Sequence, residues 1–200
     1  MRYPLWKRIF DLIVALLGLA LVSPLVPFIA LAIKLDSAGP IIVKLQRVSE
    51  GRKIGVYKFR SMVKDAEELK ESLMHLNERK DGPLFKIKHD PRLTRVGKLL
   101  RKFRLDEFPQ LINVLKGELA VVGPRPREPK EAERYPEAYR GILNIRQGVT
   151  GLSQVSGASS LPFEKEIELD KSYTENVTLW GDLKILFKTI TILFFDPTAV

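Results

Sequence analysis

The longest apolar run of the chain extends from Leu12 to Ile33 and holds 22 residues without a charge. As an α-helix it would measure roughly 33 Å, which is enough to cross the hydrocarbon layer of a membrane. Ser23 and Pro24 lie at its midpoint, and a proline removes a helical hydrogen bond and clashes with the preceding turn. We therefore expect a sharp bend at these two residues.

Basic residues flank this run on both sides. Positive residues beside a membrane segment tend to stay on the cytoplasmic side, so charges at both ends favour a segment that dips into the bilayer and returns. Residues 1–36 are thus predicted to form a re-entrant helix-break-helix. An ordinary kinked spanning helix is one alternative. A secretory signal peptide is another, because Ala30-Leu31-Ala32 resembles a cleavage site. The flanking cations are Arg2, Lys7, Arg8, Lys34, Lys44, Arg47, Arg52 and Lys53.

Residues 41–62 alternate apolar and polar side chains around Glu50 and Gly51. An alternation of period two that is interrupted by a turn pair predicts two short strands in a hairpin. Lys58 and Arg60 are two residues apart, so their side chains should share one face. From the pattern alone, this face is either the solvated side of the hairpin or a basic surface for a ligand.

The rest of the chain shows mainly helical periodicity. We expect a mainly helical α+β fold in which residues 1–36 form the membrane hairpin and residues 37–200 form one domain. The last helix places an apolar stripe beside Lys184 and Lys188, which favours a position in the membrane interface over one in a core. The predicted elements are a charged helix at 65–80, a short strand at 84–88, a basic helix at 95–104, a helix from Asp106 to Lys116 that stops at Gly117, a surface helix at 127–140 and two helices within 163–195; the stripe is Leu179, Leu183, Leu186, Ile190 and Leu193.

The charge balance indicates a class of partner. The chain has 200 residues, with 33 Lys and Arg against 24 Asp and Glu, which leaves a net charge of +9. Such an excess indicates a nucleic acid, an acidic membrane surface or a phosphorylated substrate. No recognisable nucleic-acid motif supports the first of these. The chain has no cysteine and two histidines, which excludes disulfides, thiol catalysis and a histidine-rich metal centre.

Two adjacent acids, Asp106 and Glu107, follow a basic stretch that contains Arg101, Lys102 and Arg104. Aspartate is a good N-cap, so Asp106 is expected to cap the helix that follows. The helix dipole and the nearby cations favour its ionised form, so it should be a carboxylate at neutral pH. Backbone amides at this helix end would suit an anionic ligand. The simpler interpretation is that Asp106 only caps a helix and Glu107 is a solvated acid.

Two segments rich in glycine and proline follow. In the Gly-Pro-Arg-Pro turn at 123–126, two prolines restrict the backbone around Arg125 and reduce the entropy that this side chain would lose on gripping a ligand. The segment RQGVTGLSQVSG at 146–157 is expected to be a loop whose backbone approaches a ligand closely. Without further information, the Gly-Pro-Arg-Pro turn could be an ordinary proline loop.

Four motifs in this order resemble the bacterial sugar transferase family. They are KRIFDLIVALLGLALVSPLV near the N-terminus, YKFRSM at 57–62, RLDEFPQLINVLKGELAVVGPRP at 104–126 and RQGVTGLSQVSG at 146–157. Members of this family are monotopic phosphoglycosyl transferases, which move a sugar phosphate from a nucleotide sugar to a polyprenyl phosphate. The resemblance extends over nearly the whole chain.

The resemblance implies an enzyme of the bacterial inner membrane with its catalytic domain on the cytoplasmic face, a UDP-sugar donor and undecaprenyl phosphate as acceptor. It implies a re-entrant segment with its break at Ser23 and Pro24. It makes Asp106 the nucleophile that forms a phosphosugar aspartyl ester, gives Glu107 a supporting role, and makes both acids ligands of Mg²⁺. The substrate-binding residues that it implies are Lys58, Arg60, Arg101, Arg125, Pro126, Arg146 and Gln154.

Arg104, Ser153 and Ser156 depart from the residues that the family more often has, so the resemblance leaves the sugar open. The oligomeric state is open as well. From charge and the apolar segment alone, the alternative is a non-enzymatic, basic membrane-associated module that binds acidic lipid or nucleic acid.

Overall fold

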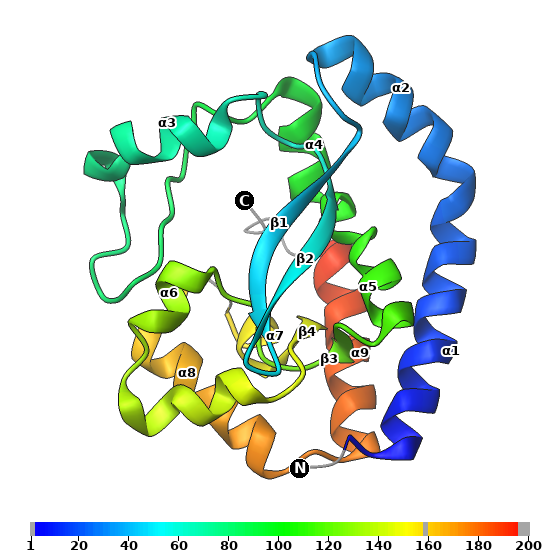
Figure 1. Ribbon diagram of the computed structural model, residues 1–200. Coiled ribbons are helices and arrows are strands. Elements are labelled where there is room, and N and C mark those ends of the chain that lie inside the picture. The colour runs from blue at the N-terminus through cyan, green and yellow to red at the C-terminus, as the bar shows by residue number, and fades with distance from the viewer. Residues whose placement is uncertain (1–2, 158–159, 196–200) are drawn as a thin grey trace.

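The computed structural model describes residues 3–157 and 160–195 (Figure 1). It is mainly helical with a small antiparallel hairpin, which confirms the predicted fold at this level. The helices are α1 (Leu5–Val22), α2 (Val26–Asp36), α3 (Ala66–Ser72), α4 (Arg95–Lys102), α5 (Gln110–Lys116), α6 (Pro129–Glu133), α7 (Leu152–Val155), α8 (Phe163–Glu175) and α9 (Leu179–Phe195), and 3₁₀ turns cover Ser23–Leu25, Met74–Leu76, Leu105–Glu107 and Glu137–Asn144. The strands are β1 (Ile42–Ser49), β2 (Arg52–Phe59), β3 (Ala120–Val122) and β4 (Gly148–Thr150).

Helices α1 and α2 form one bowed stretch along the side of the molecule (Figure 1). A 3₁₀ turn at Ser23–Leu25 joins them, at the position where the sequence predicts a break. Ser23 Oγ donates a hydrogen bond to the carbonyl of Ala20 at 2.9 Å, and the backbone keeps helical dihedral angles on both sides of the turn. The chain therefore bends within a helical path and does not open into a loop.

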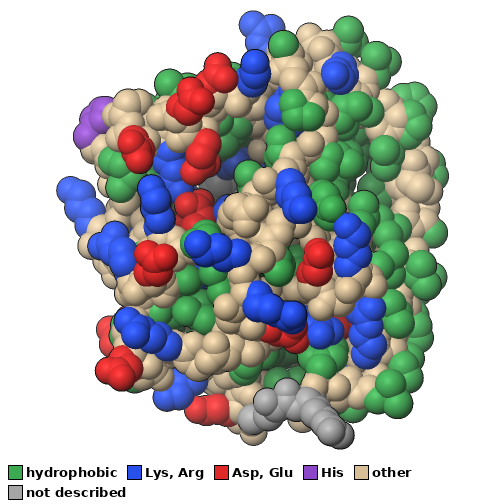
Figure 2. Space-filling model, in the orientation of Figure 1, with side chains coloured by type: hydrophobic (Ala, Val, Ile, Leu, Met, Phe, Trp, Pro, Cys, Tyr) green, Lys and Arg blue, Asp and Glu red, His purple; other side chains and the backbone are tan. Residues whose placement is uncertain are grey.

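This stretch is apolar and exposed. Leu5–Asp36 is the one helix of the described residues that is long and apolar enough to cross a membrane; in its most apolar window the mean hydropathy is 2.6 and 11% of the residues are buried. A helix of a soluble core would be buried, so this exposure fits contact with lipid. Its length and composition are also those of a signal sequence. Figure 2 shows the apolar edge, to which Leu5, Ile9, Ile13, Leu16, Leu17, Leu21, Leu25, Val26, Phe28, Leu31 and Leu35 contribute exposed side chains.

Both ends of the bowed stretch are fastened to the rest of the molecule by polar contacts. Near its start, the buried Lys7 side chain pairs with the buried carboxylate of Asp182 on α9. Arg8 donates hydrogen bonds to two carbonyls at the end of α5, both at 2.7 Å. At the other end, Asp36 accepts a hydrogen bond from a backbone N–H of α4 at 2.8 Å. The stretch is thus anchored at both ends and packs on the core through Ala15, while residues 23–28 at the bend are exposed.

Strands β1 and β2 form the predicted hairpin, in which Val43 pairs with Lys58 and the turn is at Glu50 and Gly51. Both turn residues have a positive φ, as the tightest hairpin turns require. A second, parallel pair joins β3 to β4. The segment 146–157, expected to be a loop, therefore contains a strand and the short helix α7. The main core packs these elements against α1 and α9 through Ala15, Val56, Leu111, Val114, Leu119, Val121, Val122, Val155, Tyr173 and Ile185.

Besides the surface helix expected at 127–140, which is interrupted before Pro136 between α6 and the 3₁₀ turn Glu137–Asn144, two predicted elements differ in the structure. The charged helix expected at 65–80 ends at Ser72 and is followed by a 3₁₀ turn. The strand expected at 84–88 is not formed. Asn77 accounts for the second difference, because its side chain donates to the carbonyl of Leu84 at 3.0 Å and accepts from the N–H of Lys86 at 2.9 Å. These contacts hold the segment as a closed loop and satisfy backbone groups that a strand partner would otherwise bind.

The two C-terminal helices, α8 and α9, confirm the prediction for 163–195. Helix α9 buries Ile185 and leaves Leu179, Trp180 and Phe187 exposed at 47%, 66% and 71%. One side thus packs on the core while an apolar side remains in solvent, as expected of a helix that lies in an interface. The side chain of Leu193 lies outside the described residues.

Candidate active site

The acid pair lies in a tight turn between α4 and α5. Arg104 has a φ of 51°, in the left-handed region, and the next three residues form the 3₁₀ turn that carries Asp106 and Glu107. Pro109, and not Asp106, takes the N-cap position of α5, so the predicted capping role is wrong. Gly117 ends the helix with a φ of 78°, as predicted. Because Asp106 caps nothing, its carboxylate is free for other chemistry.

The side chain of Lys58, on β2, lies next to both acids. Its Nζ donates to Glu107 Oε1 at 2.7 Å and lies 3.9 Å from Asp106 Oδ2. Arg125 reaches the same Glu107 oxygen at 3.5 Å. Among the described residues, no side chain or backbone group donates a hydrogen bond to Asp106. Glu107 is therefore the structural partner of the cations, and Asp106 is the acid that remains available.

The surroundings move the two pKa values in opposite directions. Burial raises the pKa of Asp106, which is 4% exposed, and the charge of Glu107 adds to this effect. This direction is opposite to that expected from the helix dipole and the neighbouring cations. For Glu107, burial opposes ionisation, but the charges of Lys58 and Arg125 outweigh it and hold its pKa at about 2. A carboxylate with a raised pKa is a stronger nucleophile than one held in an ion pair.

Arg101 and the Gly-Pro-Arg-Pro turn complete the cluster. Arg101 Nε donates to Ser61 Oγ at 3.0 Å, and its charge acts on Asp106. The turn that carries Arg125 and Pro126 is fixed on both sides by backbone hydrogen bonds: Pro124 O accepts from β4 at 2.8 Å and Arg127 O accepts from β1 at 2.9 Å. The buried Arg127 side chain reinforces the turn. A rigid backbone thus presents Arg125 to the acids.

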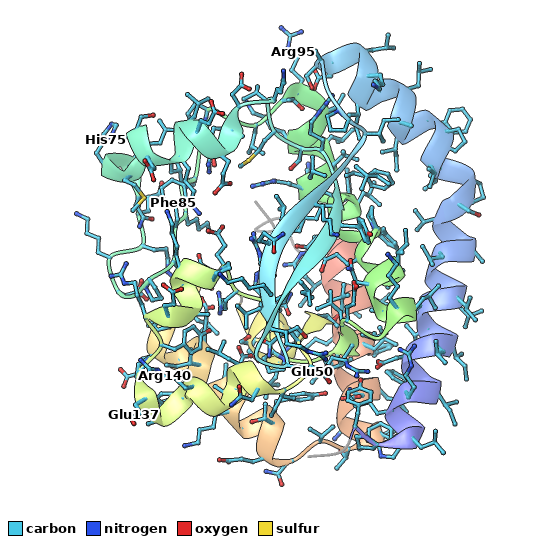
Figure 3. The ribbon with its side chains drawn as sticks, viewed as in Figure 1. Glu50, His75, Phe85, Arg95, Glu137 and Arg140 are labelled. Carbon is cyan, nitrogen blue, oxygen red and sulfur yellow. The ribbon has the colours of Figure 1, made fainter. Side chains whose placement is uncertain are left out.

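Three residues that the resemblance implies are not brought to the acid pair. Arg60 lies beyond the end of β2, and its guanidinium donates to the carbonyls of Ile33 and Ser37 at the end of α2, at 3.3 and 2.6 Å. Arg146 pairs with Glu50 at 3.0 Å. Figure 3 labels Glu50 at the turn of the hairpin, whereas Lys58 lies six residues from the turn end of the ladder, or about 20 Å away.

Gln154 is buried on α7, where its amide donates to Val149 O at 3.1 Å. Its Oε1 has no hydrogen-bond partner among the described residues, and neither do Nε and Nη1 of Arg60. Buried polar atoms without a partner are uncommon and call for a reason such as a ligand or a water molecule.

A buried ionic network that no sequence pattern predicted lies behind the turn. Glu166 of α8 accepts from Arg79 and from Arg127, both at 2.7 Å, and Arg127 Nε donates to the hydroxyl of Tyr135 at 3.0 Å. One helical turn on, Asp170 accepts from Ser153 at 2.7 Å. A spacing of four residues on one helix was the available signal, but nothing in the sequence shows that this face is buried.

The acids provide a donor set that fits Mg²⁺. This ion is commonly held by one or two carboxylates together with substrate phosphates. No group of three or more potential metal ligands occurs among the described residues. Two adjacent carboxylates meet the requirement, and Asp106 fits better than Glu107 because it is not engaged by a hydrogen bond.

Figure 2 shows basic and acidic side chains gathered on the face to the left of the hairpin, over α3 and α6. The fold and the cluster define a class of protein: a mainly helical chain with one exposed apolar helix and a polar site of paired acids and cations suited to phosphate. The model of the bacterial sugar transferase family matches residues 2–196. The chain belongs to this family.

Several curated relatives are similar to this chain. The undecaprenyl-phosphate galactose phosphotransferase of Salmonella typhimurium is 41% identical over 194 residues, which cover 94% of this chain and 40% of that protein. The UDP-glucose:undecaprenyl-phosphate glucose-1-phosphate transferase of Escherichia coli is 37% identical, with coverages of 98% and 41%. The exopolysaccharide production protein ExoY of Rhizobium meliloti is 38% identical, with coverages of 92% and 83%. The chain thus spans about 40% of the length of the first relatives and most of the length of ExoY.

Proposed function

We propose that this protein transfers a sugar phosphate from a UDP-sugar to undecaprenyl phosphate through a covalent intermediate on Asp106. Membership of the family and the names of the relatives support the donor and acceptor classes. The observation that carries the assignment of the nucleophile is the buried Asp106 carboxylate, which accepts no hydrogen bond from the described residues and lies next to Lys58 and Arg101.

The reaction consists of two displacements at phosphorus. A carboxylate oxygen of Asp106 attacks the phosphorus atom that carries the sugar, a bond to phosphorus forms, and the bond to the bridging oxygen breaks, so that UMP leaves with the electron pair. An oxygen of the lipid phosphate then attacks the same phosphorus atom, and Asp106 is released as a carboxylate. Lys58, Arg101 and Arg125 stabilise the negative charge that develops on the phosphate oxygens. Two half-reactions at one site imply ping-pong kinetics.

Asp106, with Glu107 beside it, would hold Mg²⁺. When bound, this ion would neutralise phosphate charge and orient the donor. In this proposal Glu107 keeps Lys58 and Arg125 in place, since it contacts Lys58 at 2.7 Å and Arg125 at 3.5 Å.

We propose further that α1 and α2 form a re-entrant segment in the bacterial inner membrane, with residues 37–200 on the cytoplasmic face. A spanning helix would place its ends on opposite sides of a bilayer core of roughly 30 Å. Here Lys7 at one end and Asp36 at the other both bind the same body of the protein. This arrangement fits a bow that enters the lipid and returns, and it brings the acid pair near the surface where lipid phosphates lie.

The test is to incubate the purified protein with a panel of UDP-sugars, undecaprenyl phosphate and Mg²⁺ and to measure UMP release. We expect release with at least one donor, and a phosphosugar adduct on the protein in intact-mass spectra when the lipid is omitted. Asp106→Asn should lose the adduct and reduce turnover by roughly 10³-fold or more. Glu137→Gln, an exposed acid far from the site (Figure 3), is the control and should behave as wild type.

Lipid product formed at a normal rate by Asp106→Asn would refute the covalent intermediate. If no donor released UMP, the transferase itself would be refuted, and the non-enzymatic membrane module would take its place.

A further inference from the structure

Arg47 of β1 lies on the same face of the hairpin as Lys58. Val43 pairs directly with Lys58, and residues opposite each other in an antiparallel pair point to the same side. Arg47 is four residues from Val43, so it shares this side and lies about 13 Å further along the strand. The face that presents Lys58 to the acids therefore also carries Arg47, and Arg52 lies on it at the turn end, opposite Ser49.

Arg47 Nη1 donates to the carbonyl of Gln46 at 2.7 Å, whereas its contact with a carboxylate is long. Its Nη2 lies 3.5 Å from Glu128 Oε1, which is longer than the usual 2.7–2.9 Å of an ionic hydrogen bond. The other carboxylate oxygen of Glu128 is bound by Lys70. The Arg47 side chain is 21% exposed, so part of it is accessible to a ligand from solvent.

Arg125 links Arg47 to the acid pair. The positive charge of Arg125 acts on Arg47, and Nη2 of Arg125 lies 3.5 Å from Glu107 Oε1. Burial and this repulsion lower the pKa of Arg47, while Glu128, Glu131 and Glu67 oppose the shift. An anion that lies between two arginines offsets the repulsion between their like charges.

We propose that Arg47 binds the phosphate of the nucleoside monophosphate end of the donor, the part that leaves, while Glu128 holds the guanidinium in the free protein. The inference rests on the proposed function. The attacked phosphorus lies at Asp106, so the nucleotide end must extend away from it. Lys58 and Arg47 on the hairpin, together with Arg125 on the neighbouring turn, provide positive charge for that path.

Equilibrium binding of UDP and UMP to the full chain in nanodiscs tests the proposal without requiring turnover. Arg47→Gln should weaken the affinity for both nucleotides by roughly 10- to 100-fold, as expected for the loss of a charged hydrogen bond. Glu128→Gln should leave the affinity unchanged or increase it, because it removes the competing carboxylate and keeps an acceptor. Arg52→Gln is the matched control, since Arg52 pairs with Glu50 at 2.8 Å on the same hairpin but is 76% exposed, and it should bind as wild type.

A loss of affinity in Arg47→Gln, with unchanged or increased affinity in Glu128→Gln, supports phosphate binding. Equal losses in both variants, or wild-type affinity in Arg47→Gln, overturn it, because a purely structural ion pair is broken from either side. Should Arg47→Gln fail to fold, Arg47→Lys keeps the charge without the planar fork and should show a smaller loss of affinity. Arg47-dependent UDP binding without UMP release from any donor would refute the proposed function and leave this site intact. UMP release together with wild-type nucleotide affinity in Arg47→Gln would support the proposed function and refute this site.

Discussion

Lys58 Nζ is 2.7 Å from Glu107 and 3.9 Å from Asp106, so one cation ties down the second acid of the pair and leaves the first free. Two neighbouring acids of the same turn thereby acquire different properties. Glu107 has a pKa held at about 2, while burial raises the pKa of Asp106. The division of roles between nucleophile and support follows from which acid the lysine reaches.

Replacing Lys58 with methionine should remove the cation that gives Asp106 and Glu107 their different properties. We expect UMP release to fall on the order of 10²-fold, because a charge that stabilises the transferred phosphate is lost. A depressed carboxyl pKa contributes stability above the unfolded value of 4.5, and this contribution is lost as the pH falls toward about 2. Denaturation midpoints of Lys58→Met and wild type should therefore differ at pH 7, differ less below pH 4.5 and converge only near pH 2. An unchanged rate together with a pH-independent difference would contradict this role.

Asp170 should respond to pH in the opposite sense. Burial raises its pKa from 3.8 to about 6, and its Oδ2 has no hydrogen-bond partner among the described residues. A raised carboxyl pKa gives stability that is fully present below pH 4 and is lost as the pH rises through 6. The shift corresponds to roughly 3 kcal/mol at most. Asp170→Asn keeps an acceptor for Ser153 and cannot ionise.

We therefore expect Asp170→Asn to be more stable than wild type at pH 7.5 and to lose this advantage at pH 4, as measured by chemical denaturation. Ser153→Ala is the control, because it removes the hydrogen bond and leaves the carboxyl group. An Asp170→Asn effect that is equal at both pH values would show that the carboxyl group is ionised throughout.

Local patterns predicted the elements whose contacts are close in sequence. The alternation around Glu50 gave the hairpin correctly, and Gly117 correctly ended α5. The β3–β4 pair was missed because it joins Ala120 to Gly148, and no local pattern reports a pairing over such a separation. The strand expected at 84–88 failed because Asn77 binds that backbone from outside the segment.

The site shows the same limit. Sequence and resemblance together named Lys58, Asp106, Glu107 and Arg125, which the structure brings into one cluster. The shared face expected for Lys58 and Arg60 is not formed, since Arg60 lies past the last residue of the strand and turns to α2. Arg47 was counted only as a membrane-flanking cation, because its relation to Lys58 depends on the register of the hairpin and not on spacing in the chain.

Gly97 should be intolerant of any side chain. A Cβ at this position would lie 1.9 Å from the carbonyl oxygen of Ser61, which is backbone and cannot move alone. Gly97→Ala should push α4 away from the residue that binds Arg101. We expect a loss of about 1–3 kcal/mol in stability and, from a displacement near the reacting groups, a rate lower on the order of 10²-fold.

Gly141→Ala is the matched control for this substitution, because nothing lies within 4 Å of its Cβ position. Its stability should change by about 0.5 kcal/mol or less, with wild-type UMP release. If both alanine variants behaved alike in thermal melts and in turnover, the close contact between α4 and Ser61 would not matter to the site.

The bowed helix can be mapped because the chain has no cysteine. Leu5, Leu21 and Leu35 lie at the start, near the bend and at the end of the stretch, with exposures of 76%, 77% and 79%, so single cysteines at these positions are matched in access within the protein. In vesicles of known orientation, a membrane-impermeant maleimide should label positions 5 and 35 from the cytoplasmic side and position 21 from neither side. A spanning helix would instead expose positions 5 and 35 on opposite sides, because its ends would be separated by a bilayer core of roughly 30 Å. Labelling of position 5 from the outer side alone would therefore eliminate the re-entrant arrangement, while the polar contacts of Lys7 and Asp36 with one body favour labelling from a single side.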